Sequence, residues 1–329
     1  MEEAVVKELE QHYGFTVEGT PLRLGGLSNE NYQLETSRGK VVIKKYNSNS
    51  NEEIQKIEHQ ALGHLHTKGI NYVPRLLIYK NDAQENSPND QTTIRIGSDV
   101  YALFEYIEAR EYHKRVSQIT DAGRKLGLIH GGLEDLGSVL ENISRRKTIG
   151  VKKEWLEKIK EYGKKRRDIG AEVIAILKET TGDIESQDLK ETHFHADYHP
   201  GNVLFDDEGV LAVLDFEAVF KHGHRILDLS FAAYNFGMKY HPKTWNLKDI
   251  DVERFQSFLK GYHEAAPLTS TEIVLLPEAL ITHRAEYLCQ YLEEAAITPS
   301  KKGEQNIKEA VLTIELAWQK RKRITQFML

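Results

Sequence analysis

The sequence predicts an α+β fold in two parts: an antiparallel sheet with one helix over residues 1–107, and a mainly helical part over residues 108–329. Segments with strand-like patterns are confined to the first hundred or so residues, and helical spacing of apolar residues dominates after them. A length of 329 residues also exceeds what one hydrophobic core usually covers. Two lobes are therefore expected.

The first part opens with a predicted helix over residues 1–14. Six short segments then have strand character, and glycine or polar residues separate them: 22–24, 31–36, 41–46, 74–79, 93–96 and 100–106. From these we expect a five-stranded antiparallel sheet. A helix that Asn51 caps and Gly69 ends interrupts the strands. Residues 80–92 are predicted to form a polar hairpin loop.

The second part is predicted to be mostly helical. Apolar residues recur at helical spacing in six stretches: 117–131, 133–190 with interruptions, 228–238, 251–264, 271–295 and 303–327. Residues 152–167 are rich in lysine and arginine, but glutamates interleave them. This mixture predicts a solvated helix face in preference to a binding patch.

The stretch Thr192–Phe216 carries the most informative pattern. His195, Asp197 and Asn202 form H-x-D-x-x-x-x-N, and two short apolar runs joined by a four-residue turn follow, ending at Asp215. Such runs predict a β-hairpin, which brings Asn202 and Asp215 to the same end. A divalent cation can then lie between these two residues, with Asp197 placed to accept a hydroxyl proton. Phosphoryl transfer uses these groups, because its catalysis is mostly positioning and charge neutralisation.

Composition excludes several other classes of function. Apolar residues make up 40% of the chain and charged residues 29%, as in ordinary soluble globular proteins. The net charge of −6 argues against nucleic acid as the main partner. A single cysteine, Cys289, rules out an internal disulfide. The N-terminus lacks a signal-peptide pattern, and no apolar run reaches membrane-spanning length. We expect a cytoplasmic protein without a membrane partner.

Two candidate sites for nucleotide phosphates precede this stretch. Lys44 ends the strand run V-V-I-K, and Glu58 on the following helix can orient it through an ion pair. The alternative is an exposed strand lysine, since Lys45 beside it faces the opposite side of the sheet. The Gly-Gly turn that leads to Ser28 and Asn29 can cradle an anion with its backbone N–H groups, or can simply be a turn.

Histidines around the central stretch suggest a metal at first sight. His193, His195 and His199 alternate along one extended segment, which does not converge three imidazoles, so a zinc site is disfavoured. We expect His195 to be buried and to hydrogen-bond the loop backbone, and His199 to reach a phosphate. Asp228, in an apolar run, either caps a helix or braces the loop, and bracing is favoured.

These motifs resemble the aminoglycoside phosphotransferase / homoserine kinase / choline kinase superfamily, whose fold is that of protein kinases. The resemblance covers nearly the whole chain. It rests on the Gly-turn meander, V-V-I-K, E-H-Q-A-L, H-A-D-Y-H-P-G-N-V-L-F, L-D-F and L-D-L. It implies the bilobal protein-kinase-like fold, with the nucleotide bound by the N-lobe, residues 1–107, and the catalytic loop and substrate site in the C-lobe, residues 108–329.

The resemblance also implies roles for particular residues. Asp197 is expected to be the catalytic base, and His199 to lie near the γ-phosphate. Asn202 and Asp215 are expected to bind Mg²⁺. Lys44, held by Glu58, would contact the α- and β-phosphates of ATP.

Further positions complete the implied nucleotide site. Ser28 and Asn29 belong to the glycine turn. Glu105-Tyr106-Ile107 corresponds to the hinge, and the backbone there, at Glu105 and Ile107, would pair with the nucleotide base.

The sequence thus predicts an ATP- and Mg²⁺-dependent kinase that transfers the γ-phosphoryl group to a hydroxyl of a small metabolite. Homoserine, an amino alcohol, a sugar and an aminoglycoside-like compound all remain open as acceptors. A bacterial stress-type Ser/Thr protein kinase shares these motifs and is one alternative. A non-catalytic nucleotide-binding relative is the other.

Overall fold

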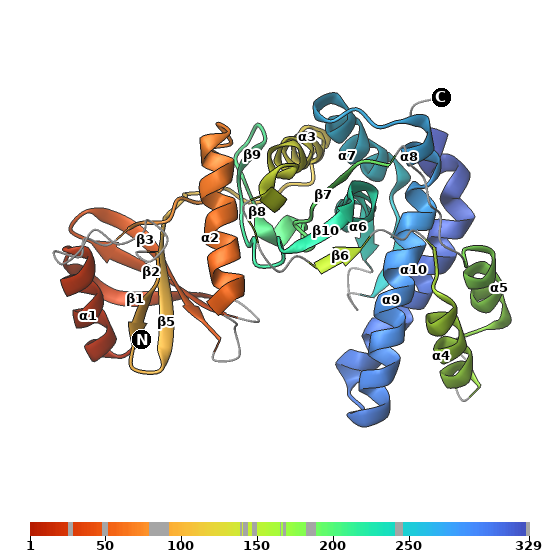
Figure 1. Cartoon of the computed structure of the whole chain (residues 1–329), viewed down its shortest axis with the longest axis horizontal. Coiled ribbons are helices and arrows are strands. Elements are labelled where there is room, and N and C mark those ends of the chain that lie inside the picture. Colours follow the sequence, from red (N-terminus) through yellow and green to blue (C-terminus); the bar gives the residue numbers. More distant parts are fainter. Residues whose placement is uncertain are drawn as a thin grey trace.

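The computed structural model (Figure 1) describes residues 1–25, 29–47, 52–78, 92–138, 140, 144–146, 150–164, 166, 169–181, 189–240 and 246–326. Ser28, the predicted helix cap Asn51 and residues 80–91 of the predicted loop lie outside the described residues.

The N-terminal part is a five-stranded antiparallel sheet between two helices. The strands follow the order β1-β2-β3-β5-β4, as predicted. The elements are α1 (Glu3–Tyr13), β1 (Val17–Gly25), β2 (Glu30–Thr36), β3 (Gly39–Tyr46), α2 (Glu52–Thr67), β4 (Ile94–Ile96) and β5 (Asp99–Glu105). In Figure 1, α1 lies at the outer end of the molecule, whereas α2 stands between the sheet and the helical part.

The alternation of side chains along β3 decides which face each residue takes. Val41 and Ile43 belong to the core cluster that includes Leu9 of α1. Tyr46 joins the other cluster, which includes Ile57 of α2. Lys44, two residues before Tyr46, therefore faces α2.

One predicted strand is reduced to a bridge. Residues 74–78 lie beside β5 through a single pairing of Leu76 with Phe104, flanked by hydrogen bonds from Leu77 N to Leu103 O at 2.8 Å and from Glu105 N to Arg75 O at 3.0 Å. Pro74 has no N–H to donate, which removes a ladder bond at the start of this segment. Because residues 74–78 form only a bridge, five of the six predicted segments are strands of the sheet, and the predicted number of five strands is correct.

The C-terminal part is mainly helical, and several small sheets lie among its helices. Its elements are α3 (Val116–Leu133), η2 (Leu136–Ser138), β6 (Ser144–Arg146), α4 (Lys153–Gly163), α5 (Ala171–Glu179), β7 (Glu191–His193), η3 (Pro200–Asn202), β8 (Val203–Phe205), β9 (Val210–Val213), β10 (Lys221–His224), α6 (Arg225–Gly237), β11 (Met238–Tyr240), β12 (Leu247–Ile250), α7 (Val252–Ala265), α8 (Ser270–Val274), α9 (Leu276–Ile297) and α10 (Lys301–Thr325). No described helix is both long and apolar enough to cross a membrane.

Three helix predictions need correction. Within 133–190 the described residues form only α4 and α5, together with the short η2 and β6. The predicted helix 271–295 is split into α8 and α9, because Pro277 cannot continue a helix and takes the first turn of a new one. The predicted helix 228–238 begins at Arg225.

Close packing of α3 on α7 supports the interior of this part. A Cβ added at Gly123 would lie 1.9 Å from Phe258 O, and one at Gly261 would lie 1.7 Å from Thr120 O. Only glycine permits the two backbones to approach so closely. The crossing brings His130 of α3 to Tyr262 of α7, where His130 Nδ1 and the Tyr262 hydroxyl are 2.8 Å apart.

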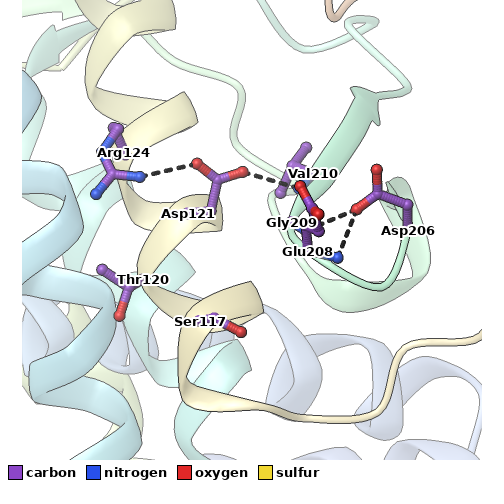
Figure 2. Close-up of a pocket in the computed structure, with 8 residues that line it drawn as sticks. All are labelled: Ser117, Thr120, Asp121, Arg124, Asp206, Glu208, Gly209 and Val210. Atoms are coloured by element: carbon purple, nitrogen blue, oxygen red, sulfur yellow. Dashed lines mark hydrogen bonds and ion pairs between the residues drawn. The ribbon is translucent and has the colours of Figure 1, made fainter.

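The hairpin of β8 and β9 is fixed to α3 at its turn. Asp121 of α3 accepts a hydrogen bond from Val210 N at 2.8 Å and one from Arg124 at 3.0 Å, beside a surface hollow of about 500 Å³ (Figure 2). Asp206 accepts from the backbone N–H groups of Glu208 and Gly209 at 2.8 and 2.7 Å. These carboxylates are occupied in holding the turn, so the opposite end of the hairpin has a fixed position.

Candidate active site

A buried ion pair joins β3 to α2. Lys44 Nζ lies 2.9 and 3.2 Å from the two carboxylate oxygens of Glu58, and both residues are buried. Burial alone lowers the pKa of the Lys44 ammonium, but the charges of Glu58, Glu217 and Asp215 outweigh it and hold the pKa above its ordinary value. The predicted pair is therefore present. Lys45 points the other way and pairs with Asp99 at 2.7 Å.

The carboxylate of Glu58 is itself held in place. The Tyr46 hydroxyl donates to Glu58 at 3.0 Å and lies 2.8 Å from His59 Nε2. His59 Nδ1 in turn lies 2.8 Å from the Thr92 hydroxyl. Burial, assisted by Lys44, lowers the pKa of His59 to about 3, so its imidazole is neutral and adds no second cation beside Lys44.

Glu217 completes a carboxylate cluster around the lysine. Its carboxylate contacts Lys44 Nζ at 2.5 Å and accepts a hydrogen bond from the Asn29 amide. Burial raises the pKa of Glu217, and Lys44 opposes this only in part. Carboxylate oxygens of Glu58, Asp215 and Glu217 all lie within 4.8 Å of one another. Oxygen donors at this spacing are the kind that Mg²⁺ and Ca²⁺ prefer.

Glu217 is the residue that was missed as a site member. It stands two positions after Asp215, in the D-F-E pattern, and this pattern was the available signal. Asn29 was expected in an anion-binding turn. Its side chain links Glu217 to the start of the segment after β3, because Asn29 Oδ1 accepts from Asn47 N at 2.9 Å.

The predicted base lies on the loop before η3. Asn202 Nδ2 donates to the carboxylate of Asp197 at 2.9 Å and to its backbone oxygen at 3.0 Å. This leaves the amide oxygen of Asn202 as the atom available to a cation. His199 Nε2 is 3.6 Å from Asp197 Oδ2, and Gly201 N donates to His199 Nδ1 at 3.0 Å. Asp197, His199 and Asn202 are thus gathered at one end of the hairpin.

Asp215 arrives at the same end, as the hairpin pattern predicts. Leu214 N donates to Asn202 O at 2.8 Å, which places the residues before β8 next to those after β9. Asp215 has φ +65°, a left-handed conformation that is uncommon outside glycine. The turn directs the chain onward to Glu217 and the lysine.

A buried carboxylate holds the backbone of the loop that leads to Asp197. Asp228 of α6 accepts hydrogen bonds from His195 N at 2.8 Å and Ala196 N at 2.9 Å, and His130 Nε2 lies 3.0 Å away. Ala196 has φ +62°, so these bonds hold a strained backbone one residue before Asp197. Burial by itself raises the pKa of Asp228, but the interactions with His130 and His195 outweigh it and lower the pKa. Asp228 braces the loop, as favoured, and does not cap the helix.

The histidines do not form a zinc cluster. His195 Nε2 lies 2.8 Å from Leu214 O, and His193 Nδ1 lies 2.8 Å from Val219 O. Among the described residues, the ring nitrogens of these histidines do not come together at ligand spacing, whereas the oxygens of Glu58, Asp215 and Glu217 do. Burial lowers the pKa of His195, which keeps its imidazole neutral.

The predicted hinge lies at the end of β5, which ends at Glu105. Glu105 donates its backbone N–H to Arg75 O, and its carboxylate accepts from Arg75 N at 3.2 Å. Ile107 follows β5 and is partly exposed. The N–H of Glu105 is thus already used within the chain.

Fold and site together define a kinase-like phosphotransferase: an antiparallel sheet with a buried lysine–glutamate pair, followed by a helical part with a loop of Asp, Asn and Asp. Residues 18–268 match the model of the phosphotransferase enzyme family known as APH. The chain belongs to this family and is a phosphotransferase.

Solved structures agree on the fold. A spectinomycin phosphotransferase in complex with ADP and spectinomycin has a TM-score of 0.66 at 16% identity, and the match covers 98% of this chain and 99% of that one. Amicoumacin kinase, in complex with AMP-PNP and Ca²⁺, has a TM-score of 0.65 at 17% identity over 95% and 93% of the two chains. A microcompartment-associated aminopropanol kinase gives 0.64 at 15% identity over 99% and 100%. No curated protein matches the sequence.

Proposed function

We propose that this phosphotransferase moves the γ-phosphoryl group of ATP, with Mg²⁺, to a hydroxyl of a small molecule. One observation carries the proposal: the buried Lys44–carboxylate cluster and the loop of Asp197 and Asn202 meet at the same end of the β8–β9 hairpin. Phosphoryl transfer needs a cationic phosphate contact, a metal site and a base within one site.

On the phosphate side, Lys44 is the residue that contacts the nucleotide. An ammonium has three donors, and Glu58 and Glu217 occupy at least two of them. At most one N–H of the Lys44 ammonium is therefore left, and a phosphate oxygen can accept a hydrogen bond from it. Residues 1–107, with Ser28, Asn29 and the hinge at Glu105 and Ile107, would hold the rest of the nucleotide.

On the metal side, Asn202 and Asp215 would hold Mg²⁺, which when bound neutralises charge on the phosphate oxygens. Glu217 offers a further oxygen ligand close to Asp215. Each of these residues presents an oxygen, which suits this cation.

On the acceptor side, Asp197 is the proposed base. Its carboxylate is about half exposed, so an incoming hydroxyl can reach it. The hydrogen bond from Asn202 orients the carboxylate, and His199 beside it can meet the γ-phosphate. Residues 108–329 would supply the acceptor site.

The test is an ADP-release assay with purified protein, ATP, Mg²⁺ and a panel of hydroxyl compounds, run beside Asp197→Ala and Asp215→Ala. We expect Asp197→Ala to lose about 10²–10⁴-fold in rate while a fluorescent ATP analogue still binds. Asp215→Ala is expected to lose metal-dependent transfer. Near-normal transfer in either variant would sink the proposal. Labelling of proteins, with no small acceptor used, would favour a protein kinase instead.

A further inference from the structure

A cavity of about 320 Å³ opens beside the predicted catalytic loop. Phe194 and Ala196 of the loop line it, and Ala196 is directly followed by Asp197. Its volume equals that of roughly ten water molecules at ~30 Å³ each, which is at the small end of ligand sites. A small acceptor that occupies it would lie beside Ala196, the residue directly before Asp197.

Two lysines line this cavity, and neither has a carboxylate partner among the described residues. Lys221 is the first residue of β10 and is partly buried, and Lys152 precedes α4. Neither forms an ion pair with any part of the chain that the structure describes. An unpaired ammonium at a cavity wall attracts a negative group, and a charge-assisted hydrogen bond is the stronger kind.

The position of Lys221 is tied to the loop. Phe194 N donates to Lys221 O at 2.8 Å, and Lys221 N donates to Ala218 O at 3.0 Å. These bonds fix the backbone of Lys221 beside a residue three positions before Asp197. A group bound by the Lys221 ammonium is thereby held at a defined place relative to the base.

The cavity is lined by two lysines and two carboxylates, and both carboxylates have other interactions. Asp228 lines it, but its carboxylate already accepts from two backbone N–H groups and interacts with His130. Glu286 is the other carboxylate in the lining. Glu286 also interacts with another part of the chain. The wall is therefore not acidic, and a purely cationic acceptor would meet two lysines.

The aromatic side chains of the cavity are also poorly placed to bind a cation. Lys152 Nζ already lies 5.2 Å from the centroid of the Trp155 ring. His283 is stacked on Phe231 at 4.0 Å and on Tyr287 at 4.7 Å, so both faces of its ring are covered. A ligand cation on Trp155 would have to displace a lysine. The aromatic wall suits the apolar part of an acceptor.

We propose that this cavity selects acceptors that carry an anionic group as well as the hydroxyl, and that Lys221, with Lys152, binds that group. The inference rests on the proposed function, since it assigns the acceptor side of the same site. Lys221 is accordingly a specificity-determining residue. The anionic group is a carboxylate or a phosphate.

Matched acceptor pairs test the inference, because each pair differs by the anionic group alone or nearly so. Serine is compared with ethanolamine, homoserine with 3-aminopropanol, glycerate with glycerol, and glycerol 3-phosphate with glycerol. For each, kcat/KM is measured with ATP and Mg²⁺ in the wild type, Lys221→Met, Lys221→Arg and Lys260→Met. Lys260 is an exposed lysine of α7 outside the cavity and serves as the matched control.

We expect the wild type to prefer the anionic member of at least one pair. Lys221→Met should lower kcat/KM for that member by about 10- to 100-fold, the range for one charge-assisted hydrogen bond, and should change the neutral or cationic member less than about threefold. Lys221→Arg should restore part of the loss, and Lys260→Met should leave every value unchanged. Thermal unfolding of each variant reports whether it folds.

Preference for ethanolamine, 3-aminopropanol or glycerol over their anionic partners would overturn the inference and leave the proposed kinase function standing. Equal loss for both members of a pair in Lys221→Met would also overturn it. Calorimetric titration of the same compounds in the presence of a non-hydrolysable ATP analogue reads the acceptor side without turnover. Absence of both turnover and anion-dependent binding would refute the inference, and ATP binding without any acceptor turnover would separately count against the kinase function.

Discussion

Replacing Asp228 by asparagine removes the charge that holds the strained loop before Asp197. The carboxylate accepts from His195 N and Ala196 N and lies 3.0 Å from His130 Nε2, and it is only 3% exposed. An asparagine of the same shape keeps one acceptor oxygen and turns the other position into a donor. That donor would face an N–H group, so at least one buried N–H loses its partner.

The structure sets the size of the effect. Removing one partner of a buried charged network costs about 3–5 kcal/mol in free energy of unfolding, because the remaining groups stay buried and unpaired. The matched control is Asp135→Asn, whose exposed carboxylate pairs with Lys68 at 2.6 Å and with His64 at 2.8 Å. Exposed pairs contribute about 0–1 kcal/mol, so the control should change little.

Urea denaturation measures the free energy of unfolding of both variants, and the ADP-release assay measures whether the loop still positions Asp197 for transfer. Asp228→Asn should also lower kcat more than it raises KM for ATP, because the loop of Asp197 moves while Lys44 and Glu58 do not. Because the pKa of Asp228 is lowered on folding, its contribution is present above the unfolded pKa near 3.9 and is lost as pH falls through the lower folded pKa. A free energy of unfolding within 1 kcal/mol of the wild type, with unchanged kcat, would refute the bracing role.

Three further predictions follow from other contacts. Glu217→Gln should raise the Mg²⁺ concentration for half-maximal activity by about tenfold, as is usual for lost metal-site support; an unchanged metal titration would remove Glu217 from the site. Gly261→Ala should destabilise the protein by at least about 1–3 kcal/mol, because its Cβ would lie 1.7 Å from Thr120 O. A Cβ at Gly131 would have no atom within 4 Å, so Gly131→Ala should be neutral or slightly stabilising. Equal melting temperatures for the two variants would contradict the close crossing of α3 and α7. Folding lowers the pKa of His59 to about 3, so between pH 6.5 and 3 the unfolded chain binds a proton that the folded chain does not. The free energy of unfolding should therefore fall as pH drops from about 6.5 toward 3. His59→Gln should flatten that pH dependence, and an unaltered dependence would argue against a neutral buried imidazole.

The fold was predictable where a local pattern decides an element. The meander, α2 and the β8–β9 hairpin follow from apolar spacing and turn residues that are close in sequence. Strand β10 was not foreseen, because Lys221–His224 carries no apolar alternation and is a strand only through pairing with β6 and β7. The same holds for β11 with β12, which pair with each other after α6.

Contacts within the site were predictable where the two residues are close in sequence. Asp197 and Asn202 are five residues apart and interact directly. The Lys44–Glu58 pair spans fourteen residues between adjacent elements, and the strand lysine followed by a helix glutamate suggested it. The link from Asn29 to Glu217 spans 188 residues. No pattern within either segment encodes that contact, because it depends on how the sheet meets the hairpin.

The two sides of the site are held by different means, and this explains which perturbations should separate them. Asp197 depends on the interior of the helical part, through Asp228, His130 and the glycine crossing of α3 and α7. Lys44 depends on carboxylates from α2 and from the segment after β9, and Glu217 is the group that joins both sides. A cation bound beside Asp215 would draw on the same Glu217 carboxylate that contacts Lys44, so metal binding should loosen that contact while leaving the Asp228 network intact. Mutations in the network should then affect transfer and stability together, whereas those at Glu217 should affect metal and nucleotide dependence with little loss of stability.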